Sequence, residues 1–313
     1  MKFGLFSGIL WGLDTVVLGI ALAMAPYFGT ADAAAFASIA SSFIHDAGCA
    51  IWLLIYMGVR GRLKDTVAAL KTRSGLVVML GALLGGPIGM TGYVIAINNI
   101  GPAYTAIISA FYPALGALLS FILLKERMSA KQIAALIVAL LGVMAMGVIS
   151  AGDSEMGNTT LGLAGAVLAV IGWGSEAVLC AWGMKDDAVD NETALQIRET
   201  TSALVYGLVV VPVFGAWGFA ASAIPSFATG VIALSALAGT ASYLFYYKGI
   251  SLIGAAKAMA LNISYSAWAV AFGFILQGTV PSLATVFFCI VILVGTVLAA
   301  SDWNELFGKK AEA

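Results

Sequence analysis

Long apolar runs separated by short polar segments make up the hydrophobic pattern of this chain. A membrane-spanning helix needs about 20 mostly apolar residues, because hydrocarbon offers no partner for backbone N–H and C=O groups. The pattern predicts ten such helices. They lie near residues 3–25, 34–57, 75–97, 101–124, 130–150, 159–183, 193–219, 225–248, 254–276 and 281–302.

Composition supports a membrane environment. Of the 313 residues, 61% are hydrophobic and 10% are charged, whereas a soluble domain has roughly 45–50% apolar and about 25% charged residues. No single core could hide this much apolar surface, so we expect an all-α polytopic protein covered by the lipid bilayer. No basic tract indicates nucleic acid, and the three cysteines all fall inside predicted spans, which argues against a disulfide framework.

The positive charges alternate between the two ends of the predicted spans. With ten spans, the segments on one side contain Lys2, Arg60, Arg62, Lys64, Lys71, Arg73, Lys125, Arg127, Lys131, Lys185, Lys248, Lys309 and Lys310. The predicted loops on the other side contain no Lys or Arg. This asymmetry predicts that both termini are cytoplasmic. A nine-span alternative would put Lys309 and Lys310 on the wrong side.

The two halves of the chain resemble each other. The matching pieces are Trp11-Gly12-Leu13-Asp14 with Trp173-Gly174-Ser175-Glu176, Ile100-Gly101-Pro102-Ala103 with Ile253-Gly254-Ala255-Ala256, and Tyr112 with Tyr265. We therefore predict two five-helix repeats, residues 1–151 and 152–313. Because five is an odd number of spans, the repeats are expected to be inverted, which is the architecture of alternating-access transporters.

A tryptophan and an acid stand three residues apart on the first and on the sixth predicted helix. The pairs are Trp11 with Asp14 and Trp173 with Glu176, and each pair shares one helix face. An indole beside a carboxylate suits an organic cation, because aromatic faces attract ammonium groups. The alternative is that these aromatic residues belong to packing or to the interfacial belt. Intramembrane acids usually have a function, which favours the binding interpretation.

Further aromatic residues could line the same cavity. Tyr243, Tyr246 and Tyr247 lie on the eighth predicted helix, and Tyr265 and Trp268 lie on the ninth. We take these aromatic residues as candidate walls of the cation site.

His45 and Asp46 lie midway along the second predicted helix, and His45 is the only histidine in the chain. Histidine titrates near physiological pH, so this pair is a candidate proton relay or gate. An equally supported interpretation is a neutral His45 bonded to a neighbouring carbonyl, with Asp46 capping or pairing nearby.

Arg198 and Lys257 are expected near helix ends, where each could snorkel or pair locally. We assign them structural or gating roles. No metal-ligand cluster, nucleophile triad or phosphate loop is visible in the sequence, which argues against an enzyme and against a metal or other cofactor.

The chain resembles the drug/metabolite transporter superfamily of EamA-type ten-helix permeases. The resemblance rests on the ten spans, the two five-helix repeats, and the turn Glu126-Arg127-Met128-Ser129 followed by Gln132. More specifically, it is similar to the Lic-type bacterial choline transporters. The matching blocks are residues 4–13, His45-Asp46, residues 81–90, Trp173-Gly174-Ser175-Glu176, Ile197-Arg198, Tyr246-Tyr247, Ala256-Lys257-Ala258 and residues 261–265.

The resemblance implies a secondary transporter of the bacterial inner membrane that imports choline or a related quaternary ammonium compound, with protons as the coupling ion. It also implies that Trp11 and Trp173 form an aromatic cage, that Tyr246 closes the cage, and that Glu176 balances the ammonium charge. A second hypothesis in the same superfamily is an exporter of amino acids or cationic drugs. In that case Arg198 or Lys257 would contact a substrate carboxylate.

Two positions depart from the pattern of the Lic-type transporters. Asp14 stands where that pattern has glycine, and Glu199 stands where glutamine is expected. Both departures add acid near the expected cage. Such acid would suit a second positive charge on the substrate or a different coupling ion.

Overall fold

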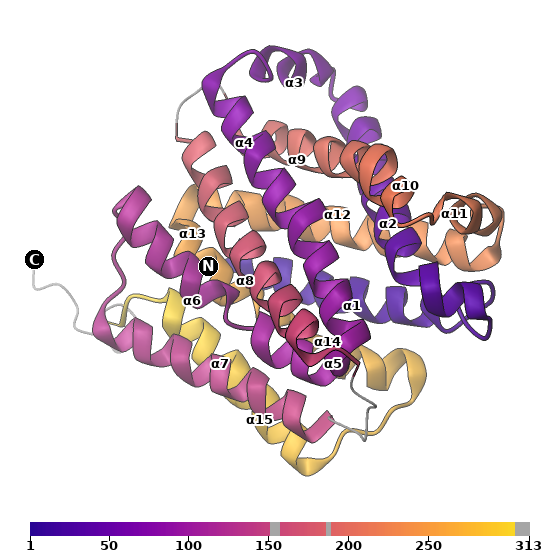
Figure 1. Ribbon diagram of the computed structural model, residues 1–313. Coiled ribbons are helices and arrows are strands. Elements are labelled where there is room, and N and C mark those ends of the chain that lie inside the picture. The colour runs from indigo at the N-terminus through magenta and orange to yellow at the C-terminus, as the bar shows by residue number, and fades with distance from the viewer. Residues whose placement is uncertain (151–156, 186–188, 304–313) are drawn as a thin grey trace, which may run out of the picture.

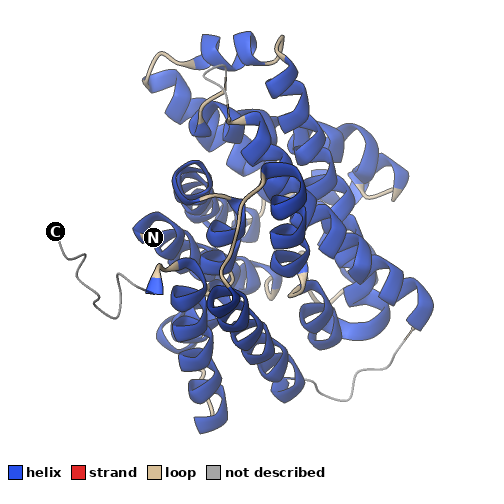
Figure 2. Cartoon of the chain, turned by 90° about the vertical axis from the view of Figure 1, so that its left-hand side faces the viewer, coloured by secondary structure: helices blue, strands red, loops and turns tan. Residues whose placement is uncertain are grey.

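The computed structural model describes residues 1–150, 157–185 and 189–303, and in these residues the regular structure is helical, with no strand (Figures 1 and 2). The helices are α1 Lys2–Leu22, α2 Ala31–Val59, α3 Leu63–Ala69, α4 Arg73–Leu83, α5 Thr91–Ser109, α6 Tyr112–Leu119, α7 Ala130–Ser150, α8 Thr159–Gly183, α9 Asn191–Val205, α10 Val211–Val213, α11 Trp217–Ala223, α12 Phe227–Ile253, α13 Ala255–Asn262, α14 Tyr265–Gln277 and α15 Leu283–Ala300. Three π-helical segments continue these helices: η1 Leu84–Met90, η2 Ser120–Leu124 and η3 Tyr206–Val210.

Side-chain caps explain where several helices begin. The first amides of a helix have no partner inside the helix, and a short polar side chain just before them can accept their hydrogen bonds. Such capping residues precede α2, α4, α8, α9, α12 and α15. They are Thr30, Thr72, Asn158, Asp190, Ser226 and Ser282.

Eight of the described helical segments are long and apolar enough to cross a membrane, compared with the ten spans expected from the sequence. One difference arises at Gly101, whose φ of 77° breaks the segment Arg73–Ser109 into two parts. Its second part runs on towards the shorter apolar helix Tyr112–Leu124. The other expected span, α9 to α10, contains Glu192, Arg198 and Glu199, which reduce its hydropathy. The all-helical polytopic class is confirmed, and the count of ten stays a prediction.

Helices from the first half of the chain pack mainly against helices from the second half. α1 packs against α12, α5 against α8, and α7 against α15. In Figure 1, α7 and α15 lie side by side, and α8 crosses next to α5. α2 and α4 both contact α9. The interior of the bundle is therefore lined by residues from both halves.

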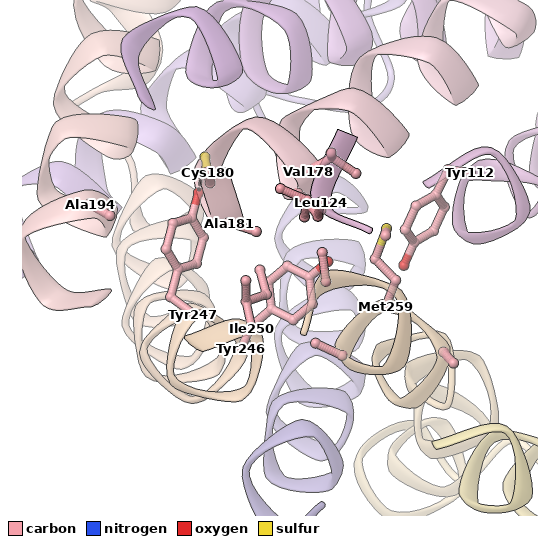
Figure 3. Close-up of a cluster of buried hydrophobic side chains, with 14 of the residues drawn as sticks. Tyr112, Leu124, Val178, Cys180, Ala181, Ala194, Tyr246, Tyr247, Ile250 and Met259 are labelled. Carbon is pink, nitrogen blue, oxygen red and sulfur yellow. Dashed lines mark hydrogen bonds between the residues drawn. The ribbon is translucent and has the colours of Figure 1, made fainter. Parts of the chain in front are cut away.

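Part of the largest buried apolar cluster, which is drawn in Figure 3, lies toward one end of the bundle. It includes Leu53 of α2, Val78 of α4, Leu124 of η2, Leu195 of α9 and Met259 of α13. Each of these side chains is within about two helical turns of a cationic residue or of the ion pairs described next. We call this the basic end. The cluster fills the space between these helices.

An ion-pair cluster ties the segment after α2 to the beginning of α9 at the basic end. Arg62 pairs with Asp190 and Glu192, and its Nε lies 2.9 Å from Asp65 Oδ2. Arg60 also pairs with Glu192. Asp190 in addition accepts hydrogen bonds from the amides of Glu192 and Thr193, so one carboxylate both caps α9 and holds Arg62.

The pKa of Asp190 provides a test of this cluster. Partial burial raises the pKa of Asp190, but hydrogen bonds from Arg62 and Thr193 outweigh burial, and the pKa lies below its ordinary value. A depressed folded-state pKa stabilises the protein above the unfolded pKa of about 4, and this contribution is lost as pH falls below that value. We expect Asp190→Asn, which keeps a capping side chain, to remove part of the acid-induced loss of stability. Apparent melting temperatures in detergent at pH 6, 5, 4 and 3 measure it.

Asp32→Asn is the matched control, because Asp32 is an exposed aspartate in the first turn of α2. Its pH profile should follow that of the wild type. Parallel loss of stability in the wild type and in Asp190→Asn on acidification would show that the Arg62–Asp190 pair does not stabilise the fold.

Candidate functional site

Two aromatic clusters face the interior of the bundle. In the first, the Trp11 ring lies 5.4 Å from that of Tyr243 and 5.3 Å from that of Tyr265, measured between centroids. These rings come from α1, α12 and α14. In the second, the Trp173 ring of α8 lies 5.1 Å from Tyr93 of α5 and 5.9 Å from Tyr112 of α6.

The two clusters adjoin each other. Tyr112 is within electrostatic range of Tyr243 and Tyr265, and Tyr265 is within range of Tyr93. All these rings except that of Tyr112 are partly exposed, while Tyr112 belongs to the large apolar cluster, against which Trp173 and Tyr243 also pack. The six rings therefore line one region from six helices.

An ion cluster from α1 and α2 lies beside the first aromatic cluster. His45 Nε2 is 3.0 Å from Asp14 Oδ1, and His45 Nδ1 is 3.7 Å from Asp46 Oδ1. The Ser235 hydroxyl of α12 donates to the Asp14 carboxylate and, at 3.1 Å, to the Asp14 carbonyl oxygen. His45 thus lies between two carboxylates.

A second ion cluster, from α8 and α9, lies beside the second aromatic cluster. Arg198 Nε donates to Glu176 Oε1 at 2.6 Å, and Arg198 Nη1 lies 2.9 Å from Glu199 Oε2. The guanidinium carbon lies 4.8 Å from the centre of the Tyr243 ring. The Tyr247 hydroxyl lies 3.4 Å from Glu176 Oε1. Arg198 is buried, so it does not snorkel out of the bundle.

The two ion clusters are joined directly, because the Ser202 hydroxyl of α9 donates to Asp46 of α2. They also occupy corresponding places along the chain. Asp14 and Glu176 each follow a tryptophan by three residues, and His45-Asp46 precedes Gly101 by the same number of residues as Arg198-Glu199 precedes Gly254. The second half therefore has a permanent cation, Arg198, where the first half has a titratable one.

Glycines allow these charged side chains to approach the neighbouring backbone. A Cβ on Gly239 would lie 2.8 Å from Asp14 Oδ2, and one on Gly85 would lie 1.6 Å from Glu176 Oε2. Gly85 belongs to η1, which also contains Pro87. A π-helical turn is common at functional positions of a helix, and here the wide turn and the missing side chain make room for the Glu176 carboxylate.

The structure gathers most of the candidate residues predicted from the sequence, and Lys257 lies apart from them. Tyr246 is buried in the large apolar cluster, packs against Tyr247 at 6.1 Å between ring centroids, and lies within electrostatic range of Tyr112, Tyr243 and Glu176. Figure 3 shows Tyr246 beside Ile250, while the Tyr247 hydroxyl points to Cys180. Lys257 lines a shallow pocket at the basic end with Glu126 and Arg127, away from both aromatic clusters.

Several residues of the site were not singled out from the sequence, namely Tyr93, Ser202 and Ser235. The internal repeat could have indicated Tyr93 as a site residue, because Tyr93 precedes Gly101 by as many residues as the candidate Tyr246 precedes Gly254. The serines gave no signal, because a lone serine in an apolar helix is common. The described residues contain no group of three or more His, Cys, Asp and Glu side chains that could hold a metal ion.

A multi-pass helical bundle with ionisable and aromatic side chains gathered in its interior defines the class of solute transporters. Residues 1–148 match the EamA-like transporter family. This match spans just under half of the chain, and over that part the chain is similar to the EamA-like transporter family, consistent with the drug/metabolite transporter superfamily.

Two further similarities agree with the assignment. The chain is 30% identical to protein LicB of Haemophilus influenzae over 197 residues, which cover 63% of this chain and 65% of LicB. A solved crystal structure of a protein with 18% sequence identity superimposes with a TM-score of 0.70, covering 100% of this chain and 98% of that one. At this identity the second similarity shows the fold alone.

Gly85→Ala tests the close approach of η1 to Glu176. The added methyl group would overlap the carboxylate, and Glu176 could only move by releasing Arg198. We expect a loss of stability of about 1–3 kcal/mol, as for other overpacked sites. Apparent melting temperature in detergent measures it.

Gly19→Ala is the control, because a Cβ at this exposed position of α1 has no neighbour within 4 Å. Replacing this glycine, which lies in the last turn of α1, by alanine should stabilise by up to about 1 kcal/mol. Equal effects of the two substitutions would contradict the close approach at Gly85.

Proposed function

We propose that this transporter imports choline or a related quaternary ammonium compound together with protons. The observation that carries the proposal is an excess of carboxylates, three buried and one largely buried, beside an aromatic region. Glu176, Asp14, Asp46 and Glu199 are faced by only Arg198 and His45 in the two ion clusters. A buried negative charge is costly without a partner, so these clusters favour uptake of a cation, a proton or both.

The aromatic clusters suit a cation without hydrogen-bond donors. A quaternary ammonium group cannot donate an N–H bond, and it binds to the faces of tryptophan and tyrosine rings. Trp11, Tyr243 and Tyr265 form one such surface, and Trp173 with Tyr93 forms the other. Glu176 lies within electrostatic range of Tyr112 and Tyr243, where it would balance the ammonium charge. Tyr246, within electrostatic range of Tyr112 and Tyr243, would close the cage.

The sequence blocks described above, which include Trp173 and His45, resemble the Lic-type choline transporters. This resemblance supports import. Helices of the first half of the chain pack mainly against helices of the second half. This packing supports two inverted repeats, residues 1–151 and 152–313, that rock against each other. In this proposal the basic end faces the cytoplasm of a bacterial cell, with both termini on that side.

Export of amino acids or of cationic drugs is the second candidate. An amino acid would need a cation for its carboxylate, and Arg198 already pairs with two carboxylates. Lys257 lies outside the aromatic region. A cationic drug would fit the acidic excess, so the ligand test must include one.

A thermal-shift panel distinguishes these substrates. A ligand that binds only the folded protein raises its apparent stability, by about 2.7 kcal/mol at one hundred times Kd. We expect choline to stabilise the detergent-purified protein and tryptophan and threonine to leave it unchanged. Stabilisation by an amino acid or by ethidium, without a response to choline, would replace import of quaternary amines by the second candidate.

Trp173→Ala tests the aromatic surface. Loss of a desolvated cation–aromatic contact costs about 2 kcal/mol, or roughly thirtyfold in Kd for choline. Isothermal titration measures the change. Trp217→Ala is the control, because Trp217 of α11 is a partly exposed tryptophan that packs on Phe43. Near-normal affinity of Trp173→Ala would remove Trp173 from the binding site.

His45→Gln tests the proton relay. Glutamine retains a hydrogen-bonding side chain beside Asp14 but does not titrate. We expect the pH dependence of choline uptake into proteoliposomes between pH 5.5 and 8 to flatten, while choline affinity at one fixed pH changes less. An uptake profile that keeps its shape would show that His45 is not the coupling group.

A further inference from the structure

Arg198 itself lies in a cation-binding arrangement. Its guanidinium carbon lies 4.8 Å from the centre of the Tyr243 ring, and its Nε donates to Glu176 at 2.6 Å. An aromatic face opposite a carboxylate is the combination that recognises organic cations. The protein therefore supplies its own cation to this pair of groups.

The ring beneath Arg198 belongs to the aromatic region that the proposed function assigns to substrate. Tyr243 packs against Trp11 at 5.4 Å between ring centroids. A substrate cation bound on Trp11 and Tyr243, with Glu176 as its counter-charge, would meet the guanidinium at close range. Two positive charges repel strongly in a buried site, where water does not screen them. The substrate and Arg198 cannot hold Tyr243 and Glu176 at the same time.

We propose that Arg198 is a tethered stand-in for the substrate, and that substrate binding displaces it from Tyr243 and Glu176 onto Glu199. This inference rests on the proposed function, since it takes the substrate to be an organic cation. The displaced arginine keeps a counter-charge throughout, because Glu199 lies on the same helix and is already 2.9 Å away.

The contact between Arg198 and Glu199 supports this exchange. Glu199 is fully buried, and neither of its carboxylate oxygens has a hydrogen-bond partner in the described structure. Arg198 Nη1 also lacks a well-aligned acceptor, although it is 2.9 Å from Glu199 Oε2. The pair is close but poorly aligned. Release of Arg198 from Glu176 would allow the two-bond arginine–carboxylate geometry that is strongest, and the new bonds to Glu199 would offset the broken bond to Glu176.

The corresponding position in the first half provides a contrast. His45 lies between Asp14 and Asp46, and it can lose its charge by deprotonation. Arg198 cannot lose its charge and must move instead. The two halves would therefore free their carboxylates in different ways. In the first half His45 would release a proton, and in the second half the Arg198 side chain would move.

The test is the double variant Arg198→Gln with Glu199→Gln, which removes one positive and one negative charge and so preserves the net charge of the cluster. Isothermal titration of choline and of tetramethylammonium measures binding. We expect Kd to fall at least tenfold relative to the wild type, because Glu176 and Tyr243 are then unoccupied. Methylguanidinium has the same guanidinium group as the Arg198 side chain. It should bind to the double variant in competition with choline, and it should not bind detectably to the wild type.

The matched control is His45→Gln with Asp46→Asn, which alters the corresponding positions in the first half. Its Kd for choline should not fall. Arg198→Lys is a second test variant, because lysine keeps the charge but lacks the planar fork, and it should tighten choline binding by a smaller factor. Unchanged melting behaviour shows that each variant is folded.

The outcomes separate the two proposals. Wild-type binding of choline with no tightening in either folded Arg198 variant would overturn the displacement and leave the proposed function intact. Choline binding to neither the wild type nor the double variant would contradict the proposed function and the displacement with it. Tightening in the Arg198 variants alone, with competition by methylguanidinium, supports the exchange.

Discussion

Ionisable side chains inside a membrane-spanning bundle must find partners within the protein, because hydrocarbon offers none. In this protein the requirement is met by two neighbouring ion clusters. Asp14 and His45 connect α1 to α2, while Glu176 and Arg198 connect α8 to α9. Ser202 of α9 joins the two clusters by donating to Asp46. Packing of the central helices therefore depends on charges that are only partly balanced.

Small residues make this arrangement sterically possible. Gly239 and Gly85 leave room for the Asp14 and Glu176 carboxylates, and the π-helical turn of η1 displaces the backbone beside Glu176. The aromatic rings then line the region next to the carboxylates. At the basic end, by contrast, the apolar cluster and the Arg62 ion pairs hold the helices together. The same bundle thus combines an apolar, ion-paired end with a partly exposed polar interior.

The correspondence between the halves is chemical as well as positional, and it is not complete. Arg198 stands where the first half has His45, and Tyr93 contacts Trp173 whereas its counterpart Tyr246 turns to Tyr247. If the two halves simply exchanged roles, each half would need the same ionisable and aromatic groups. Here one half contains a group that can release a proton, and the other contains a permanent charge over an aromatic ring. Such a division suits a cycle in which a proton and an organic cation are handled separately.

The sequence by itself determined the helical membrane class, the pairing of Trp11 with Asp14 and of Trp173 with Glu176 on common helix faces, and the presence of His45-Asp46 inside a span. These features follow from local periodicity and from the cost of burying charge. Only the tertiary structure decided that Asp14 binds His45, that Arg198 binds Glu176, and that Tyr243 rather than Tyr246 faces Trp11. Helices this apolar have little difference between their faces, so the neighbour that each face meets is set by packing against distant segments, and the sequence pattern does not encode it locally.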